Sequence, residues 1–96
     1  MLSIKSNCEN CQKELPNHSS EAMICSFECT FCKDCVENIL ANVCPNCGGG
    51  FEKRPTRPVH LLQKYPAETK PFFKLINWVE FEKLKTKNQH IQPNKR

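Results

Sequence analysis

The chain has 96 residues, a mean hydropathy of −0.58 and a formal net charge of +4. This length allows one small domain with a tail, and no stretch approaches the ~18 apolar residues of a membrane-spanning helix, so we expect no membrane contact. A domain this small buries too little apolar surface to offset about 1.5 kcal/mol of conformational entropy per ordered residue, so we expect covalent or metal cross-links to supply the missing stability.

Eight cysteines, all between Cys8 and Cys47, are the candidates for these cross-links. The residues before Cys8 lack the apolar segment of a secretory signal, and we therefore expect a cytoplasmic protein whose thiols stay reduced. In a reducing compartment, repeated Cys-x-x-Cys pairs indicate metal ligands rather than a disulfide framework.

The cysteine-rich segment contains only short predicted elements. Residues 23–25 and 31–32 have the apolar content of short strands. Val36, Ile39 and Leu40 recur with the spacing of one helix face and predict a short helix. The pattern therefore favours a small, irregular, metal-stabilised α+β fold.

The composition changes after the last cysteine. Three glycines let the backbone turn away, residues 51–54 predict a returning strand, and the prolines that follow exclude a helix. Pro71 is suited to the first position of a helix. We expect four parts: a cysteine domain with two metal sites over residues 1–52, a basic, proline-rich linker over 53–70 that packs on it, a helix over 71–86 and a disordered tail over 87–96.

The helix predicted near the C-terminus is apolar on more than one face. Phe72 and Leu75 share one face, whereas Trp78 and Phe81 point elsewhere. A helix of this kind needs at least two contact surfaces. We therefore favour self-association or contact with a protein partner through residues 71–85 over docking onto the cysteine domain alone.

Eight thiolates complete two tetrahedral sites and leave no coordination position for water or substrate. The Cys-x-x-Cys spacing lets two thiolates of one turn chelate one ion, with Zn–S bonds of about 2.3 Å. Sites closed in this way are structural. We expect two structural Zn²⁺ ions, with an iron–sulfur cluster as the alternative for the same soft ligands.

The eight ligands can be divided in two ways. In a tandem arrangement, Cys8, Cys11, Cys25 and Cys29 share one ion. In an interleaved arrangement, each metal locks the segment that supports the other, and we favour this form. Its ligand sets are Cys8, Cys11, Cys32 and Cys35 for site 1, and Cys25, Cys29, Cys44 and Cys47 for site 2.

The ligand string resembles a RING-type cross-brace, whose pattern is C-x2-C…C-x-H-x2-C-x2-C…C-P-x-C. Cys29 stands where that family usually has histidine, and Pro45 matches the proline of the last pair. Residues 21–32 and 43–49 also resemble a family of small bacterial cysteine-rich proteins of unknown function, over about residues 6–69. The resemblance implies a RING-like zinc cross-brace, here with a C-terminal helical tail, and no specific activity.

The resemblance does not extend to the residues that ubiquitin ligases use. RING ligases usually carry a large apolar residue before the second ligand and often an arginine after the last ligand. This chain has Asn10 and Gly48 at those positions. A RING-type ubiquitin-ligase mimic is therefore an alternative only for a chain from a pathogen or a eukaryote.

The pattern predicts a non-catalytic protein–protein interaction or adaptor module, because the sequence shows no nucleophile beside a base and no paired carboxylates in an apolar setting. A further alternative is a zinc-ribbon-like nucleic-acid-binding protein that uses the basic residues of the linker. These residues are Lys53, Arg54, Arg57 and Lys64. Two zinc sites with four thiolates each would carry about −2 apiece, so the net charge does not favour nucleic acid as the partner.

Overall fold

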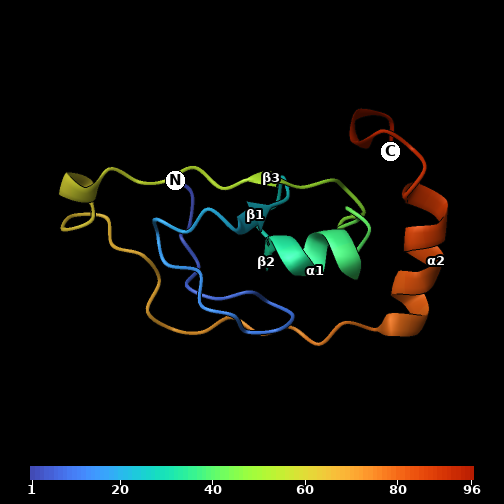
Figure 1. Cartoon of the computed structure of the whole chain (residues 1–96), viewed down its shortest axis with the longest axis horizontal. Helices are drawn as coiled ribbons and strands as arrows, with labels where there is room; N and C mark the ends of the chain where they lie inside the picture. The colour runs from blue at the N-terminus through green and yellow to red at the C-terminus, as the bar shows by residue number, and fades with distance from the viewer.

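The computed structural model describes residues 1–96 as an elongated molecule with extents of 42 × 25 × 20 Å. Short strands and one helix lie at its centre, and the C-terminal helix stands at one end (Figure 1). The elements are β1 (Ala22–Ile24), β2 (Thr30–Cys32), α1 (Lys33–Asn38), β3 (Glu52–Lys53), a 3₁₀ helix (Val59–Leu61), α2 (Trp78–Asn88) and a second 3₁₀ helix (Pro93–Lys95). The predicted small α+β fold with a C-terminal helix is confirmed. None of its helices has the length and apolar character needed to cross a bilayer.

The sheet is built around the hairpin of β1 and β2. Its strands are antiparallel in the order β2-β1-β3, with Ala22 opposite Cys32. Glu28 makes the hairpin turn with a φ of 65°, and its N–H donates to the carbonyl of Cys25 at 3.0 Å. α1 follows β2 directly, with the Cys32 sulfur accepting the N–H of Cys35 at 3.5 Å as the N-cap. The hairpin and the helix therefore fix the positions of these cysteines.

The core is small, and cysteine makes up almost half of it. Six of the fourteen residues in the buried cluster are cysteines. The apolar part is centred on Phe31 and Phe51, whose rings meet edge-to-face with centroids 5.5 Å apart. Since so few apolar side chains are buried, the cysteine clusters have to contribute to the stability of the fold.

Arg54 is the largest fully buried side chain, with an exposed fraction of 1%. Its guanidinium donates to the carbonyls of Lys5, Leu15 and Pro16 at 2.7, 3.0 and 2.8 Å. Burial lowers the pKa of this guanidinium. The prediction that Arg54 contacts nucleic acid from the surface is therefore wrong, because the side chain closes the linker onto the N-terminal segment.

α2 begins later than predicted. The sequence predicted a helix over 71–86, whereas the helix starts at Trp78 and ends at Asn88. The reason is the N-cap at Asn77, whose side-chain oxygen accepts the N–H of Glu80 at 3.2 Å. Asparagine is among the preferred N-cap residues, and this local hydrogen bond sets the first turn.

Residues on either side of α2 are tied to the cysteine domain. Asn7 accepts the N–H of Phe72 at 2.8 Å and donates to its carbonyl at 2.5 Å. At the other end, Arg96 donates to the carbonyls of Asn42 and Gly48 at 2.7 and 3.3 Å. The tail predicted to be disordered over 87–96 instead carries the end of α2, a 3₁₀ helix and these contacts.

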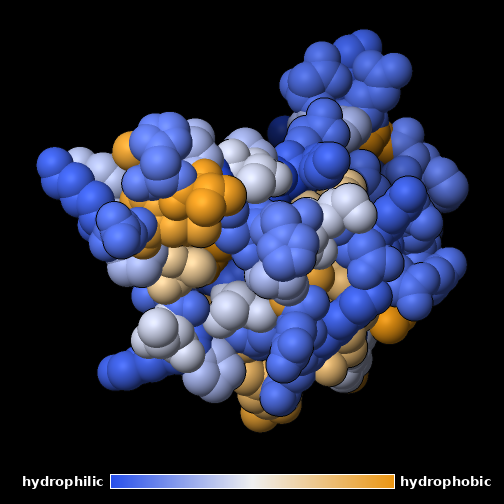
Figure 2. Space-filling view, turned by 60° about the vertical axis from the view of Figure 1, so that its left-hand side comes forward, coloured by the Kyte–Doolittle hydropathy of each residue, from blue (hydrophilic) through white to orange (hydrophobic).

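One face of α2 docks on the last cysteine turn. Phe81 has an exposed fraction of 3%, and the Asn88 amide donates to the carbonyl of Gly48 at 3.0 Å. Trp78 and Val79, on the outer side, keep exposed fractions of 49% and 69%. The face drawn in Figure 2 is mostly hydrophilic, with apolar side chains gathered in small patches. Docking accounts for one surface of the helix, and contact with a partner stays a prediction.

Gly48 is a point of close approach between α2 and the cysteine domain. Its φ is +77°, and a Cβ there would lie 2.7 Å from Nδ2 of Asn88 and 3.1 Å from Cδ1 of Leu84. Gly48→Ala should lower the free energy of unfolding by about 1–2 kcal/mol and speed hydrogen exchange of the α2 amides. Gly49→Ala is the matched control, because its Cβ would meet only the Cys47 sulfur, at 3.4 Å. Equal exchange rates in the two variants would contradict the docking.

Candidate metal centre

The first cysteine cluster joins three parts of the chain. The sulfurs of Cys8, Cys11, Cys32 and Cys35 all lie within 4.8 Å of one another. Two come from the N-terminal turn, one ends β2 and one lies in the first turn of α1. These are the four cysteines that the interleaved arrangement assigns to site 1, and the tandem arrangement does not group them.

The separations between these sulfurs fit a single tetrahedral ion. Four thiolates bound at about 2.3 Å in a tetrahedron have sulfur–sulfur separations of about 3.8 Å. The separation is 3.8 Å between Cys8 and Cys35 and 3.6 Å between Cys11 and Cys32. These two separations and the set of four thiols suit a single tetrahedral metal ion.

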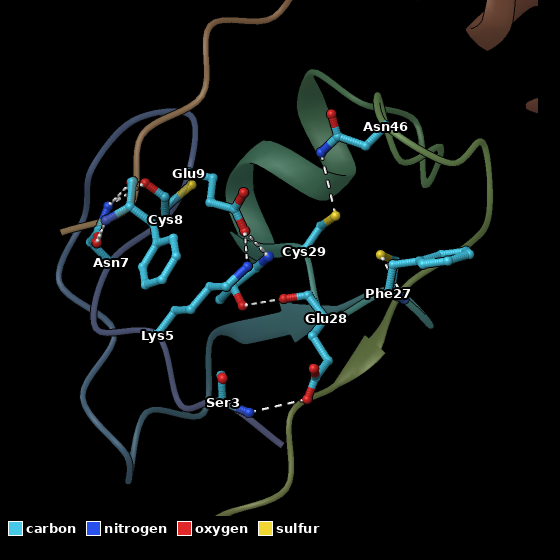
Figure 3. A network of polar contacts seen from close by, with 12 residues as sticks. Ser3, Lys5, Asn7, Cys8, Glu9, Phe27, Glu28, Cys29 and Asn46 are labelled. Carbon is cyan, nitrogen blue, oxygen red and sulfur yellow. Dashed lines mark hydrogen bonds and ion pairs between the residues drawn. The ribbon is translucent and has the colours of Figure 1, made fainter. Parts of the chain in front are cut away.

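The second cluster is less complete. The sulfurs of Cys25, Cys44 and Cys47 lie within 4.8 Å of one another, and Cys29 falls outside that group. The Cys29 sulfur accepts the side-chain amide of Asn46 at 3.3 Å (Figure 3). The structure thus brings together three of the four residues predicted for site 2 and places the fourth beside them.

Without a cation, the pKa values of four thiols, those of Cys25, Cys32, Cys35 and Cys44, are raised toward the protonated form. Burial raises the pKa of Cys25 to about 11 and also raises the pKa of Cys35. Cys29 differs, because hydrogen bonds with Cys44 and Asn46 lower its pKa to about 5 against the effect of burial. The same hydrogen bond raises the pKa of Cys44. Four sulfurs this close can all be thiolates only when a cation balances their charge.

A buried carboxylate holds the first cysteine turn against the hairpin. Glu9 accepts the N–H of Thr30 at 2.5 Å and the ammonium of Lys5 at 3.2 Å. In Figure 3 this carboxylate lies between Cys8 and Cys29. Glu9 therefore ties the turn that carries Cys8 to the start of β2, next to Cys29.

The residues that support the clusters were missed in the sequence. Glu9 has no motif of its own, and Asn10 was considered there only as the absence of an apolar residue. A repeated Cys-x-Asn-Cys spacing is the signal that could have identified Asn10 and Asn46. The three histidines are exposed and belong to neither cysteine group.

Comparison with known proteins places the chain in a family. The family model described as protein of unknown function (DUF1272) matches residues 1–57, which include all eight cysteines. An uncharacterized protein of Rhizobium meliloti (strain 1021) is 56% identical over 69 residues, which cover 72% of this chain and 82% of that protein. No solved structure matches the chain. The resemblance to small cysteine-rich proteins of unknown function is thereby confirmed, and the chain belongs to the DUF1272 family.

Proposed function

We propose that the protein is a zinc-binding module with two structural Zn²⁺ ions. The ligands of site 1 are Cys8, Cys11, Cys32 and Cys35, and those of site 2 are Cys25, Cys29, Cys44 and Cys47. The observation that carries the proposal is the agreement of the site 1 sulfur separations, 3.8 and 3.6 Å, with the edge of a tetrahedron around one ion. The proposal requires reduced thiols and therefore a reducing compartment such as the cytoplasm.

Zinc is favoured over an iron–sulfur cluster by the same distances. A cluster places several iron and sulfide atoms between its cysteine ligands, so it holds their sulfurs farther apart than a single ion does. Two of the sulfur–sulfur separations in site 1, 3.8 and 3.6 Å, are as short as one ion requires. The interleaving of the two ligand sets supports a RING-like cross-brace as the architecture of the sites.

We further propose that the module acts by binding another protein rather than by catalysis. The support is the apolar character of the outer side of α2 and of the residues before it. Leu75, Trp78 and Val79 are exposed there, although the opposite face of the helix is docked. Exposed apolar side chains grouped on one element are typical of an interaction surface.

The two alternatives have less support. Two of the basic residues proposed to bind nucleic acid are already occupied. Arg54 is buried, and the guanidinium of Arg57 donates hydrogen bonds to the carbonyls of Leu2 and Tyr65. The ubiquitin-ligase hypothesis would favour an arginine at position 48, after the last ligand. Asn88 and Leu84 fill the space that such a side chain would need.

Elemental analysis tests the proposal directly. Protein purified without added metal should contain two zinc ions per chain, and Cys35→Ser should lower this ratio because it removes a buried ligand of site 1. His18→Ala is the control and should keep two, since His18 is exposed and outside both clusters. A ratio near one in the wild type, or a brown chromophore, would contradict the assignment.

Removal of the metal should unfold the cysteine domain. Structural zinc contributes about 10–16 kcal/mol of apparent binding energy per site in small peptides, and here that energy is folding energy. Chelation at neutral pH should therefore abolish the dispersed amide resonances of residues 6–60 in one cooperative step. A chelated protein that keeps these resonances would show that the fold does not depend on metal.

Stability should rise with pH below about 8.5. Free thiols of the unfolded chain bind protons below that pH, whereas zinc-bound thiolates bind none, so the unfolded state binds more protons and acid favours it. Denaturant unfolding of the zinc-loaded protein at pH 6, 7 and 8, followed by circular dichroism, should show increasing midpoints. Identical midpoints at all three pH values would argue against thiolate ligands.

A further inference from the structure

One cysteine pair in each cluster has the sequence Cys-x-Asn-Cys. Cys8-Glu-Asn-Cys11 and Cys44-Pro-Asn-Cys47 both have asparagine in the third position. Their second residues differ completely, one being a buried carboxylate and the other a proline. A contact common to both turns therefore depends on the asparagine and not on its neighbour.

In the first cluster, Asn10 contacts both cysteine pairs. Its backbone N–H donates to the sulfur of Cys8 at 3.4 Å, within its own turn. Its side-chain amide donates to the sulfur of Cys35 at 3.4 Å, across the cluster. Cys35 is the second cysteine of the opposing pair, and it is buried.

In the second cluster, Asn46 makes the matching contacts. Its backbone N–H donates to the sulfur of Cys44 at 3.4 Å, and its side-chain amide donates to the sulfur of Cys29 at 3.3 Å (Figure 3). Cys29 is again the second cysteine of the opposing pair. In both clusters the asparagine thus bridges the two pairs that have to share one ion.

We propose that Asn10 and Asn46 are positioning residues for the two metal sites, each holding the far thiolate in place by an amide–sulfur hydrogen bond. The inference rests on the proposed zinc function. A hydrogen bond to a charged acceptor is stronger than one between neutral groups, so each amide stabilises the thiolate that the metal requires.

The exposure of the cysteines agrees with this positioning role of the two asparagines. Cys11 and Cys47, which follow the asparagine in each turn, are the only exposed cysteines. Chelators and protons therefore reach each cluster from the side of that residue. The amide secures the sulfur on the opposite, buried side, so that loss of the asparagine opens a second route for release.

The test uses the full chain loaded with ¹¹³Cd, and the same variants loaded with zinc. Wild type should give two cadmium resonances. Asn10→Leu, close in size but without a donor, should shift only one resonance, and Asn46→Leu should shift only the other. In competition with the chelator 4-(2-pyridylazo)resorcinol, each variant should lose about 10- to 100-fold in zinc affinity at one site, as is usual when a partner of a metal ligand is removed.

Asn38→Leu is the matched control. Asn38 is exposed on α1, and its amide donates to the Asp34 carboxylate at 3.1 Å, outside both clusters. This variant should leave both resonances and both affinities unchanged. Asn10→Ser and Asn46→Ser, too short to span the cluster, should reproduce the single-site effects if a leucine variant does not fold.

Two results would overturn the inference. One is a pair of variants whose resonances stay in place and whose zinc affinities stay within twofold of wild type. The other is a variant that weakens both sites equally, since that indicates general destabilisation and not the positioning of one thiolate. A wild type that binds fewer than two cadmium ions would instead overturn the proposed function, and with it the inference.

Discussion

The convergence of thiol sulfurs to within 4.8 Å of one another is the constraint on which the rest of the structure depends. Thiolates at this separation repel one another unless a cation lies between them. Because the pairs come from distant parts of the chain, one ion in each cluster would close long loops, such as the 20 residues between Cys11 and Cys32. The sheet and α1 then need to order only the short segments that carry the cysteines.

Because the core is small, the loops are held in place by polar side chains that form hydrogen bonds with the backbone. Arg54 binds three carbonyls of the N-terminal segment, Glu9 binds an amide of β2, and Asn7 binds both polar groups of Phe72. Each contact joins segments far apart in sequence. α2 completes the arrangement by covering the last cysteine turn, where Gly48 leaves room for it. The outer face of the same helix leaves Trp78 and Val79 exposed.

The sequence predicts local features well and long-range polar contacts poorly. The spacing of Val36, Ile39 and Leu40 predicts a short helix where α1 lies, although α1 ends at Asn38, before Ile39 and Leu40. The spacing of the cysteines favours the grouping of the four sulfurs of site 1. The burial of Arg54 could not be foreseen, because its partners are carbonyls up to 49 residues away that become available only after the loops fold. An apolar pattern does not reveal the cap at Asn77, so it predicts a start of α2 that is too early. The polar composition of the tail likewise does not reveal that its last residue, Arg96, binds the carbonyl of Asn42.

The central claim is that one metal ion sits in each cysteine cluster. Anomalous diffraction at the zinc absorption edge, from crystals of protein purified without added metal, tests it most directly. The account predicts two peaks, each about 2.3 Å from four sulfurs, one among Cys8, Cys11, Cys32 and Cys35 and the other among Cys25, Cys29, Cys44 and Cys47. A single peak, or a peak bonded to Cys8, Cys11, Cys25 and Cys29, would contradict it.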